Sequence, residues 1–161
     1  MRTVFFILSA FVICGAGCDK TLPEDGVSTD AKLAKAFQKT PQTIVIDGKT
    51  LTLSAELWRD FMPSIGKEER SMRAAVSISA EEGMALPRGL SFNRMVVLKG
   101  DSIWVQTIAN SERSDEIRLK ANTTGGPEWQ PETEADVVVE FLHDDKSYKL
   151  RQNSVQIRAT Y

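Results

Sequence analysis

The single histidine of the chain begins the run His143-Asp144-Asp145, which brings three potential metal ligands together. Histidine and carboxylates also serve zinc enzymes and Ser-His-Asp hydrolases. Adjacent residues in a hairpin turn point in different directions, so we interpret this run as a solvated turn between two strands. No Gly-x-Ser-x-Gly elbow occurs in the sequence to present a serine nucleophile to His143. The run therefore predicts no metal site, and a small hydrolase is the less favoured alternative.

The remaining inventory argues against other catalytic chemistry. Cys14 and Cys18 are the two cysteines and both lie near the N-terminus, so the rest of the chain has no thiol nucleophile and no disulfide framework. Glu132 and Glu134 form a carboxylate pair of the kind that glycosidases use, but in so short a chain we interpret them as exposed loop charges. We therefore predict a protein that is not an enzyme and that uses no cofactor.

Charge and hydropathy limit the partners. The 20 Lys+Arg and 22 Asp+Glu residues are interspersed and give a net charge of −2. A nucleic-acid-binding protein would carry a basic stripe or face, and the sequence contains no such run. After the first 18 residues, no apolar segment approaches the length of a membrane-spanning helix. The composition predicts no nucleic-acid partner and confines membrane contact to the N-terminus.

The first residues have the organisation of an export signal. Arg2 precedes an apolar stretch, residues 4–14, which is too short to span a bilayer. Gly15-Ala16-Gly17 then leads to Cys18. A cysteine directly after three small residues resembles the lipobox of bacterial lipoproteins. The resemblance implies cleavage before Cys18 and acylation of its thiol. The alternative is ordinary cleavage after Gly17, which leaves Cys18 as a thiol.

This interpretation divides the chain into three parts. We expect a signal peptide over residues 1–17, a lipidated cysteine with a linker over residues 18–42, and one domain over residues 43–161. The linker is polar but includes a possible short helix over residues 29–39. A helix of this length is marginal alone, so it either docks on the domain or forms only transiently. The resemblance places the protein at the cell envelope, facing the periplasm on the inner or the outer membrane.

From residue 43 onward the hydrophobic pattern has a period of two, which predicts β-strands. Nine short apolar runs are separated by turn sequences such as Asp47-Gly48 and Lys99-Gly100-Asp101. They are residues 44–46, 50–57, 73–80, 95–98, 103–108, 116–121, 137–142, 148–151 and 155–159. This pattern predicts an all-β fold, an antiparallel sandwich of immunoglobulin- or fibronectin-like architecture, with a small closed barrel as the alternative. Runs 95–98 and 103–108 are apolar on both faces, so we place them centrally or beneath a loop that covers one side.

The connection over residues 122–131 is the most suited to binding, because it combines two glycines, two prolines and Trp129. Its candidate binding residues are Asn122, Thr123, Thr124, Gly125, Gly126 and Trp129. The run Asn122-Thr123-Thr124-Gly125 followed by Trp129 faintly resembles the inhibitory loop of chagasin-type cysteine-protease inhibitors, which are exported immunoglobulin-like domains. That resemblance implies protease inhibition as an alternative function. Trp129 either plugs one end of the sandwich or anchors a partner, and we favour the first.

A second candidate interface is formed by Trp58, Arg59 and Phe61. A guanidinium beside two large rings is typical of an interface anchor, although such aromatic residues more often close a core. Taken together with the lipobox resemblance, these features predict a lipid-anchored envelope protein with a non-catalytic role in binding or assembly. The expected partners are the membrane, through the anchor, and another envelope protein or a glycan.

The anchor hypothesis is tested by the substitution Cys18→Ala. We expect this change to abolish lipid labelling and to move the protein from the membrane fraction to the soluble fraction. The physical reason is that each buried CH₂ of an acyl chain contributes about 0.8 kcal/mol, and two or more chains anchor stably where one does not. Unchanged membrane association of the variant would contradict the hypothesis.

Overall fold

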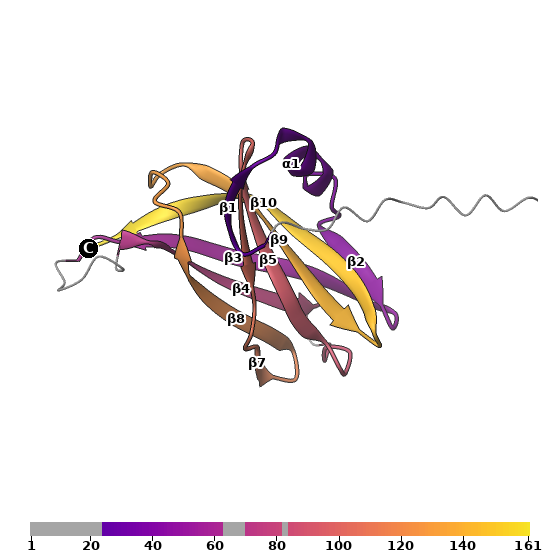
Figure 1. Cartoon of the computed structure of the whole chain (residues 1–161). Helices are drawn as coiled ribbons and strands as arrows, with labels where there is room; N and C mark the ends of the chain where they lie inside the picture. Colours follow the sequence, from indigo (N-terminus) through magenta and orange to yellow (C-terminus); the bar gives the residue numbers. More distant parts are fainter. Residues whose placement is uncertain (1–23, 63–69, 82–83) are drawn as a thin grey trace, which may run out of the picture.

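The computed structural model describes residues 24–62, 70–81 and 84–161 (Figure 1). The predicted signal peptide and Cys18 lie outside these residues. The described ranges form ten strands and one helix. In chain order these are β1 (Gly26–Thr29), α1 (Ala31–Phe37), β2 (Thr43–Ile46), β3 (Lys49–Asp60), β4 (Met72–Ala80), β5 (Ser91–Lys99), β6 (Ser102–Thr107), β7 (Glu112–Asp115), β8 (Arg118–Gly126), β9 (Glu134–His143) and β10 (Lys146–Thr160).

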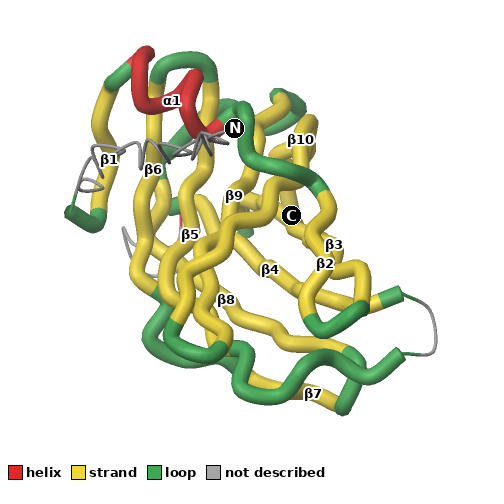
Figure 2. Tube along the Cα trace, turned by 90° about the vertical axis from the view of Figure 1, so that its right-hand side faces the viewer, coloured by secondary structure: helices red, strands yellow, loops and turns green. Residues whose placement is uncertain are grey.

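The ten strands belong to one sheet, in the order β1-β6-β5-β9-β10-β3-β4-β8-β7, with β2 paired to β3 beside this path. The sheet curls, so that one half (β1, β6, β5 and β9) faces the other (β3, β4, β8 and β7), as Figures 1 and 2 show. β10 joins the halves. Its first part pairs antiparallel with β9, and its last residues, 157–160, pair parallel with residues 57–60 of β3.

The main core lies between the two halves because the strands alternate apolar side chains inward and polar side chains outward. In β3, for example, Leu51, Leu53 and Leu57 are buried, whereas Ser54 and Glu56 are exposed. The opposing half contributes buried residues such as Met95, Val97, Trp104, Val139 and Phe141. Each large apolar side chain that is fully buried contributes roughly 1.5–3 kcal/mol, so this layer supplies most of the driving force for folding.

The helix α1 forms a second, smaller core on the outer face of β5, β6 and β9. Asp30 caps the helix, because its carboxylate accepts hydrogen bonds from the backbone N–H groups of Lys32 and Leu33, each at 2.9 Å. Ala34 and Phe37 are buried on the strands below. Their contacts are Val96, Leu98, Ile103, Val105 and Val138. The runs that are apolar on both faces are therefore covered on one side, as predicted, but by this helix and not by a loop.

Part of the segment predicted as a linker is bound to the domain. β1 pairs antiparallel with β6, with Gly26 opposite Val105. Just before it, the Asp25 carboxylate accepts hydrogen bonds from the N–H and O–H groups of Thr107, at 2.9 and 2.8 Å. The short helix follows directly and docks as described above. Of the two alternatives for residues 29–39, docking is therefore the one that the structure adopts.

The all-β prediction is confirmed, with three differences of detail. β10 is one strand where the sequence predicts two runs, because a bulge at residues 152–155, with Ser154 at φ +52°, interrupts its pairing with β9 but does not end the strand. β1 and β7 were not predicted, since each has only four, mostly polar residues. The sheet is mixed, because the β10–β3 pair is parallel, and among the described strands it stays open at β1 and β7.

Gly126, the last residue of β8, makes room for the largest buried ring of the core. A Cβ at this position would lie 2.8 Å from two ring carbons of Trp104 and 3.0 Å from the Cβ of Met72. We expect Gly126→Ala to lower the free energy of unfolding by roughly 1–3 kcal/mol, because overpacking forces side chains or backbone to shift. Urea denaturation measures this loss.

A double-mutant cycle with Trp104→Phe provides the control. The two clashing atoms of Trp104 lie in its six-membered ring, and the smaller phenyl ring leaves space there. In the Trp104→Phe background, Gly126→Ala should therefore cost clearly less than in the parent chain. Equal costs in both backgrounds would contradict the packing argument.

Candidate functional site

A groove of about 530 Å³ runs over the outer face of the half-sheet formed by β3, β4 and β8. Its floor is the central strand β4, which presents Ala75, Ser77 and Ser79. Ser54 and Glu56 of β3 line one side. The other side is lined by Arg118, Lys120 and Asn122 of β8, with Asn110 and Glu112 beyond them. The groove therefore has polar walls, most of them long side chains, and a floor of short side chains.

The strand register produces this shape. Ser77 lies between Ser54 of β3 and Lys120 of β8, and Ala75 lies between Glu56 and Asn122 in the next outward-facing row. These residues share one face because successive outward positions on a strand are two residues apart. Small side chains on β4 between longer neighbours leave the space open. A bulky residue on β4 at either position would fill it.

The groove has a polar lining with separated charges. Glu56 stands on one side, and Arg118 and Lys120 stand on the other. Within the described residues, no ion pair joins any of these three groups to another side chain. At the end of the floor, the hydroxyl oxygens of Thr52 and Ser79 lie 3.4 Å apart. The lining can therefore offer hydroxyl, amide, carboxylate and cationic groups to a polar ligand.

The prediction of a loop over residues 122–131 is wrong for its first half, which is a strand. Residues 122–126 continue strand β8 and pair with β4. The alternation of the strand separates the candidate residues: Asn122 lines the groove, Thr124 is exposed, and Thr123 is buried with its hydroxyl 3.9 Å from the sulfur of Met95. Gly125 has φ +86° and Gly126 is buried against Trp104. Asn122 is the one of these residues that lines the groove.

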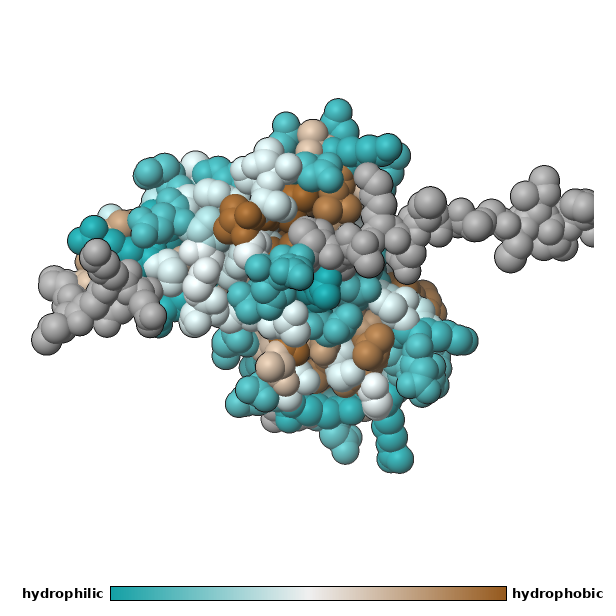
Figure 3. Space-filling model, viewed as in Figure 1, coloured by the Kyte–Doolittle hydropathy of each residue, from teal (hydrophilic) through white to brown (hydrophobic). Residues whose placement is uncertain are grey.

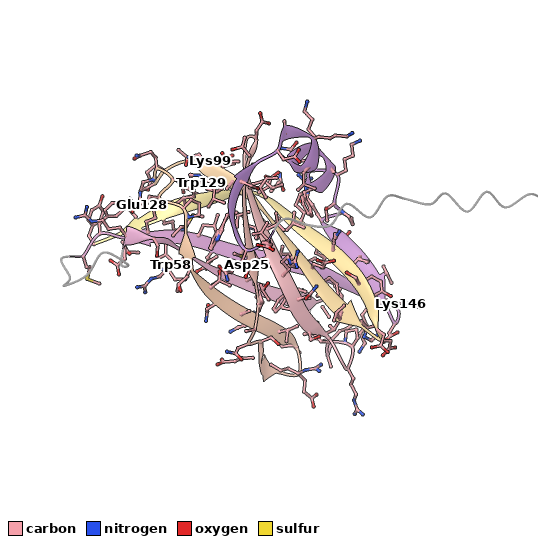
Figure 4. The ribbon with its side chains drawn as sticks, in the orientation of Figure 1. Asp25, Trp58, Lys99, Glu128, Trp129 and Lys146 are labelled. Carbon is pink, nitrogen blue, oxygen red and sulfur yellow. The ribbon has the colours of Figure 1, made fainter. Side chains whose placement is uncertain are left out.

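Trp129 lies away from the groove, in the connection between β8 and β9. Its ring is half-buried and packs against the main core. The ammonium group of Lys99 lies 5.9 Å from the ring centroid, and Figure 4 shows Lys99, Trp129 and Glu128 close together. Trp129 thus packs on the core, and a lysine lies over its ring.

Trp58, Arg59 and Phe61 do not form one surface, because neighbouring residues of a strand point to opposite faces. Trp58 lies on the same outward face of β3 as Glu56 and is half-buried. Phe61 follows the end of β3 and stacks on Tyr161, with ring centroids 5.9 Å apart. Arg59 points inward and is only 5% exposed, so it is not the exposed interface anchor that the sequence suggested. Trp58 alone of the three extends the row of residues beside the groove.

Arg59 instead holds three segments together. Its Nε donates to the carbonyl oxygen of Arg70 at 2.9 Å, and its Nη1 donates to those of Trp129 and Glu128 at 3.1 and 3.3 Å. Its Nη2 also lies 3.3 Å from Oε2 of Glu128, and its guanidinium carbon lies 5.0 Å from the ring centroid of Phe61. A buried guanidinium with several carbonyl acceptors fixes the backbone around it.

His143 is buried, which corrects the prediction of a solvated turn. It ends β9 and is 5% exposed. Its Nε2 lies 3.2 Å from a carboxylate oxygen of Asp47 and 3.5 Å from one of Asp144. Asp47 belongs to the distant β2–β3 turn, so the imidazole sits where two hairpin turns meet. Among the described residues, no group of three or more histidine, cysteine or acidic side chains is arranged to hold a metal ion.

The sequence predicted which residues of the groove face outward, but it did not predict that they line a groove. The alternation in residues 73–80 and 116–121 places Ala75, Ser77 and Ser79, and Arg118 and Lys120, on the outer face of their strands. Nothing in the sequence indicates that these two strands pair with each other. The signal for the groove in the sequence is the run of small outward residues on a strand whose other face is buried.

Comparisons with protein-family models, with curated proteins and with solved structures found no significant match. In the part of the chain that the structure describes, no helix has the length and apolar character needed to cross a membrane.

The role of Arg59 is tested by Arg59→Ala. This change leaves the carbonyl groups of Arg70, Glu128 and Trp129 without their buried donor. We expect the free energy of unfolding to fall by about 2–4 kcal/mol, since each buried polar group left unsatisfied costs roughly 1–3 kcal/mol. The matched control is Arg158→Ala, an exposed arginine on the neighbouring strand β10, which should change stability by less than about 0.5 kcal/mol. Similar thermal melting curves for the two variants would refute the role of Arg59.

Proposed function

We propose that the protein is a lipid-anchored component of a bacterial cell envelope that binds a glycan, without catalysis, in the groove over β3, β4 and β8. The anchor part of the proposal rests on Gly15-Ala16-Gly17-Cys18 and on the export signal before it. The binding part rests on the groove, which is the observation that carries the proposal.

The position of the groove favours a ligand recognised through side chains. β4 is paired with β3 on one side and with β8 on the other, so its backbone N–H and C=O groups are engaged in the sheet. A peptide that binds as an added strand needs an exposed sheet edge. Such a peptide would gain no main-chain hydrogen bonds over β4. The groove is therefore poorly suited to the commonest mode of extended-peptide binding.

The lining favours a ligand rich in hydroxyl groups. Ser54, Ser77, Ser79 and Asn122 supply donors and acceptors that can pair with sugar hydroxyls. Arg118 and Lys120 add cations that can contact carboxylate or phosphate substituents. Trp58 continues the outward row of β3 beyond Glu56 and offers part of an aromatic face at that end. The volume of about 530 Å³ falls within the usual range of small-molecule sites.

The proposal does not include protease inhibition. The resemblance to chagasin-type inhibitors depended on an exposed loop at Asn122-Thr123-Thr124-Gly125, and these residues lie in the paired strand β8. A strand that alternates its side chains between core and surface cannot insert the run into the cleft of a protease.

The proposal is tested by filling the groove. Ser77→Trp places a large ring on the floor of the groove, and Ser147→Trp places the same ring on the exposed side of β10 as the matched control. Binding would be measured by co-sedimentation with isolated peptidoglycan sacculi and on an array of neutral and acidic oligosaccharides. We expect Ser77→Trp to weaken the binding of any captured glycan at least tenfold, while Ser147→Trp leaves it unchanged.

Circular dichroism and thermal melting establish that both variants are folded. Asn122→Ala, a smaller change on the wall of the groove, should weaken the same binding by a few-fold, because one side-chain hydrogen bond is lost. Glycan binding that is unaffected by Ser77→Trp and Asn122→Ala would refute the groove as the site. Capture of no glycan by the parent protein would refute the ligand class.

A further inference from the structure

The chain is bound to the folded domain from Asp25 onward. The Asp25 carboxylate accepts hydrogen bonds from the N–H and O–H groups of Thr107, and the side-chain amide of Gln106 lies 3.4 Å from its other oxygen. β1 then pairs with β6, and the Asp30 N–H donates to the carbonyl of Asp101 at 3.0 Å. The position of Asp25 on the face of the domain is labelled in Figure 4.

This attachment limits how far the domain can stand from an anchored Cys18. Asp25 follows Cys18 by seven residues. A chain of that length spans at most about 25 Å, whatever its conformation. β1 adds four residues, or roughly 13 Å, between this point and the start of α1. The start of α1 therefore lies within roughly 40 Å of an anchor at Cys18.

The outward face of α1 is basic. Lys32 and Lys35 lie three positions apart on the helix, and Lys39 lies four positions further, in the turn that continues it. Residues with this spacing share one side of a helix. All three lysines are exposed, whereas Ala34 and Phe37 point into the core. In Figure 3 the surface at the helix is mostly hydrophilic, with apolar residues gathered beside it.

No acidic side chain neutralises this face within the described residues. The Asp30 carboxylate caps the helix start, and the backbone of Asp101 contacts that end through the Asp30 N–H. No ion pair to Lys32, Lys35 or Lys39 is formed by any described side chain. Beside the helix, the ammonium group of Lys149 lies 5.5 Å from the ring centroid of Phe37 and adds a fourth cation.

We propose that the basic face of α1, formed by Lys32, Lys35 and Lys39, docks on the anionic phospholipid headgroups of the membrane that holds the anchor. This inference rests on the anchor at Cys18 from the proposed function, but it does not depend on the glycan groove. Each lysine close to an anionic surface raises the docked population about fivefold, so three lysines contribute on the order of a hundredfold. Docking by charge orients the domain, with α1 toward the lipid and the β7 edge away from it (Figures 1 and 2).

The test uses the full lipidated chain reconstituted in vesicles. A fluorophore is attached at Ala36→Cys, an exposed position between the lysines, and quenching by headgroup spin-labelled lipid is measured. In vesicles of 30% phosphatidylglycerol and 70% phosphatidylcholine we expect at least twofold stronger quenching than in phosphatidylcholine alone. The difference should disappear in 0.5 M salt, because salt screens the attraction. A fluorophore at Glu116→Cys, in the β7–β8 turn on the opposite side, should be quenched weakly in both.

The triple variant Lys32→Gln/Lys35→Gln/Lys39→Gln should reduce quenching at position 36 to the level found in neutral vesicles. The matched control Arg88→Gln/Lys146→Gln/Arg158→Gln removes the same charge from exposed sites elsewhere and should leave quenching unchanged. Equal quenching in both lipids, or equal effects of the two triple variants, overturns the docking inference while the anchor stands. Failure of the parent chain to float with the vesicles overturns the anchor, and the docking inference with it.

Discussion

The fold depends on a strand that changes partners near its end. β10 pairs with β9 up to residue 156, with a bulge at residues 152–155, and then pairs with β3 over residues 157–160, so the two halves of the sheet share one strand. A bulge leaves backbone groups without their ladder partners, and here side chains compensate. The Asp136 carboxylate accepts from the Ser154 N–H at 3.0 Å and from Arg151 at 3.1 Å, and the Gln152 side chain accepts from the Ala55 N–H of β3.

Strand β3 takes part in both the contacts of Arg59 and the groove, which lie on opposite faces of the sheet. On the inner side, Arg59 lies in the parallel pair, and its side chain holds the backbone of Glu128 and Trp129 where the connection from β8 to β9 crosses between the halves. On the outer side, the antiparallel pairs β3–β4 and β4–β8 align Ser54, Ser77 and Lys120 in one row. The buried guanidinium of Arg59 stabilises the curled sheet, and the small outward residues of β4 leave the groove open on its outer face.

Local pattern predicted which segments are strands and which residues face inward, because a period of two depends only on strand geometry. The pattern did not predict which strands pair with one another. The groove forms because β4 lies beside β8. His143 is buried because the turn at Asp47 packs against the end of β9. Both arrangements depend on contacts between residues that are far apart in the sequence. Residues 122–126 read as a loop because glycine and asparagine are rare in strands, yet pairing with β4 outweighs that preference. Cys18 remains a prediction of the sequence alone.

The parallel pair between β10 and β3 also carries a consequence for how the chain reaches its native state. Leu57 and Ile157 are partners in that pair and lie a hundred residues apart along the chain. Contacts of such separation carry a high loop-closure entropy and form slowly. The hairpins β2–β3 and β3–β4 can form as soon as their residues leave the ribosome. The edge of β3 over residues 57–60, however, stays unpaired until β10 has been synthesised and pairs with it. During that interval the nascent protein exposes an unpaired strand edge, which is where association with another unfolded copy would begin.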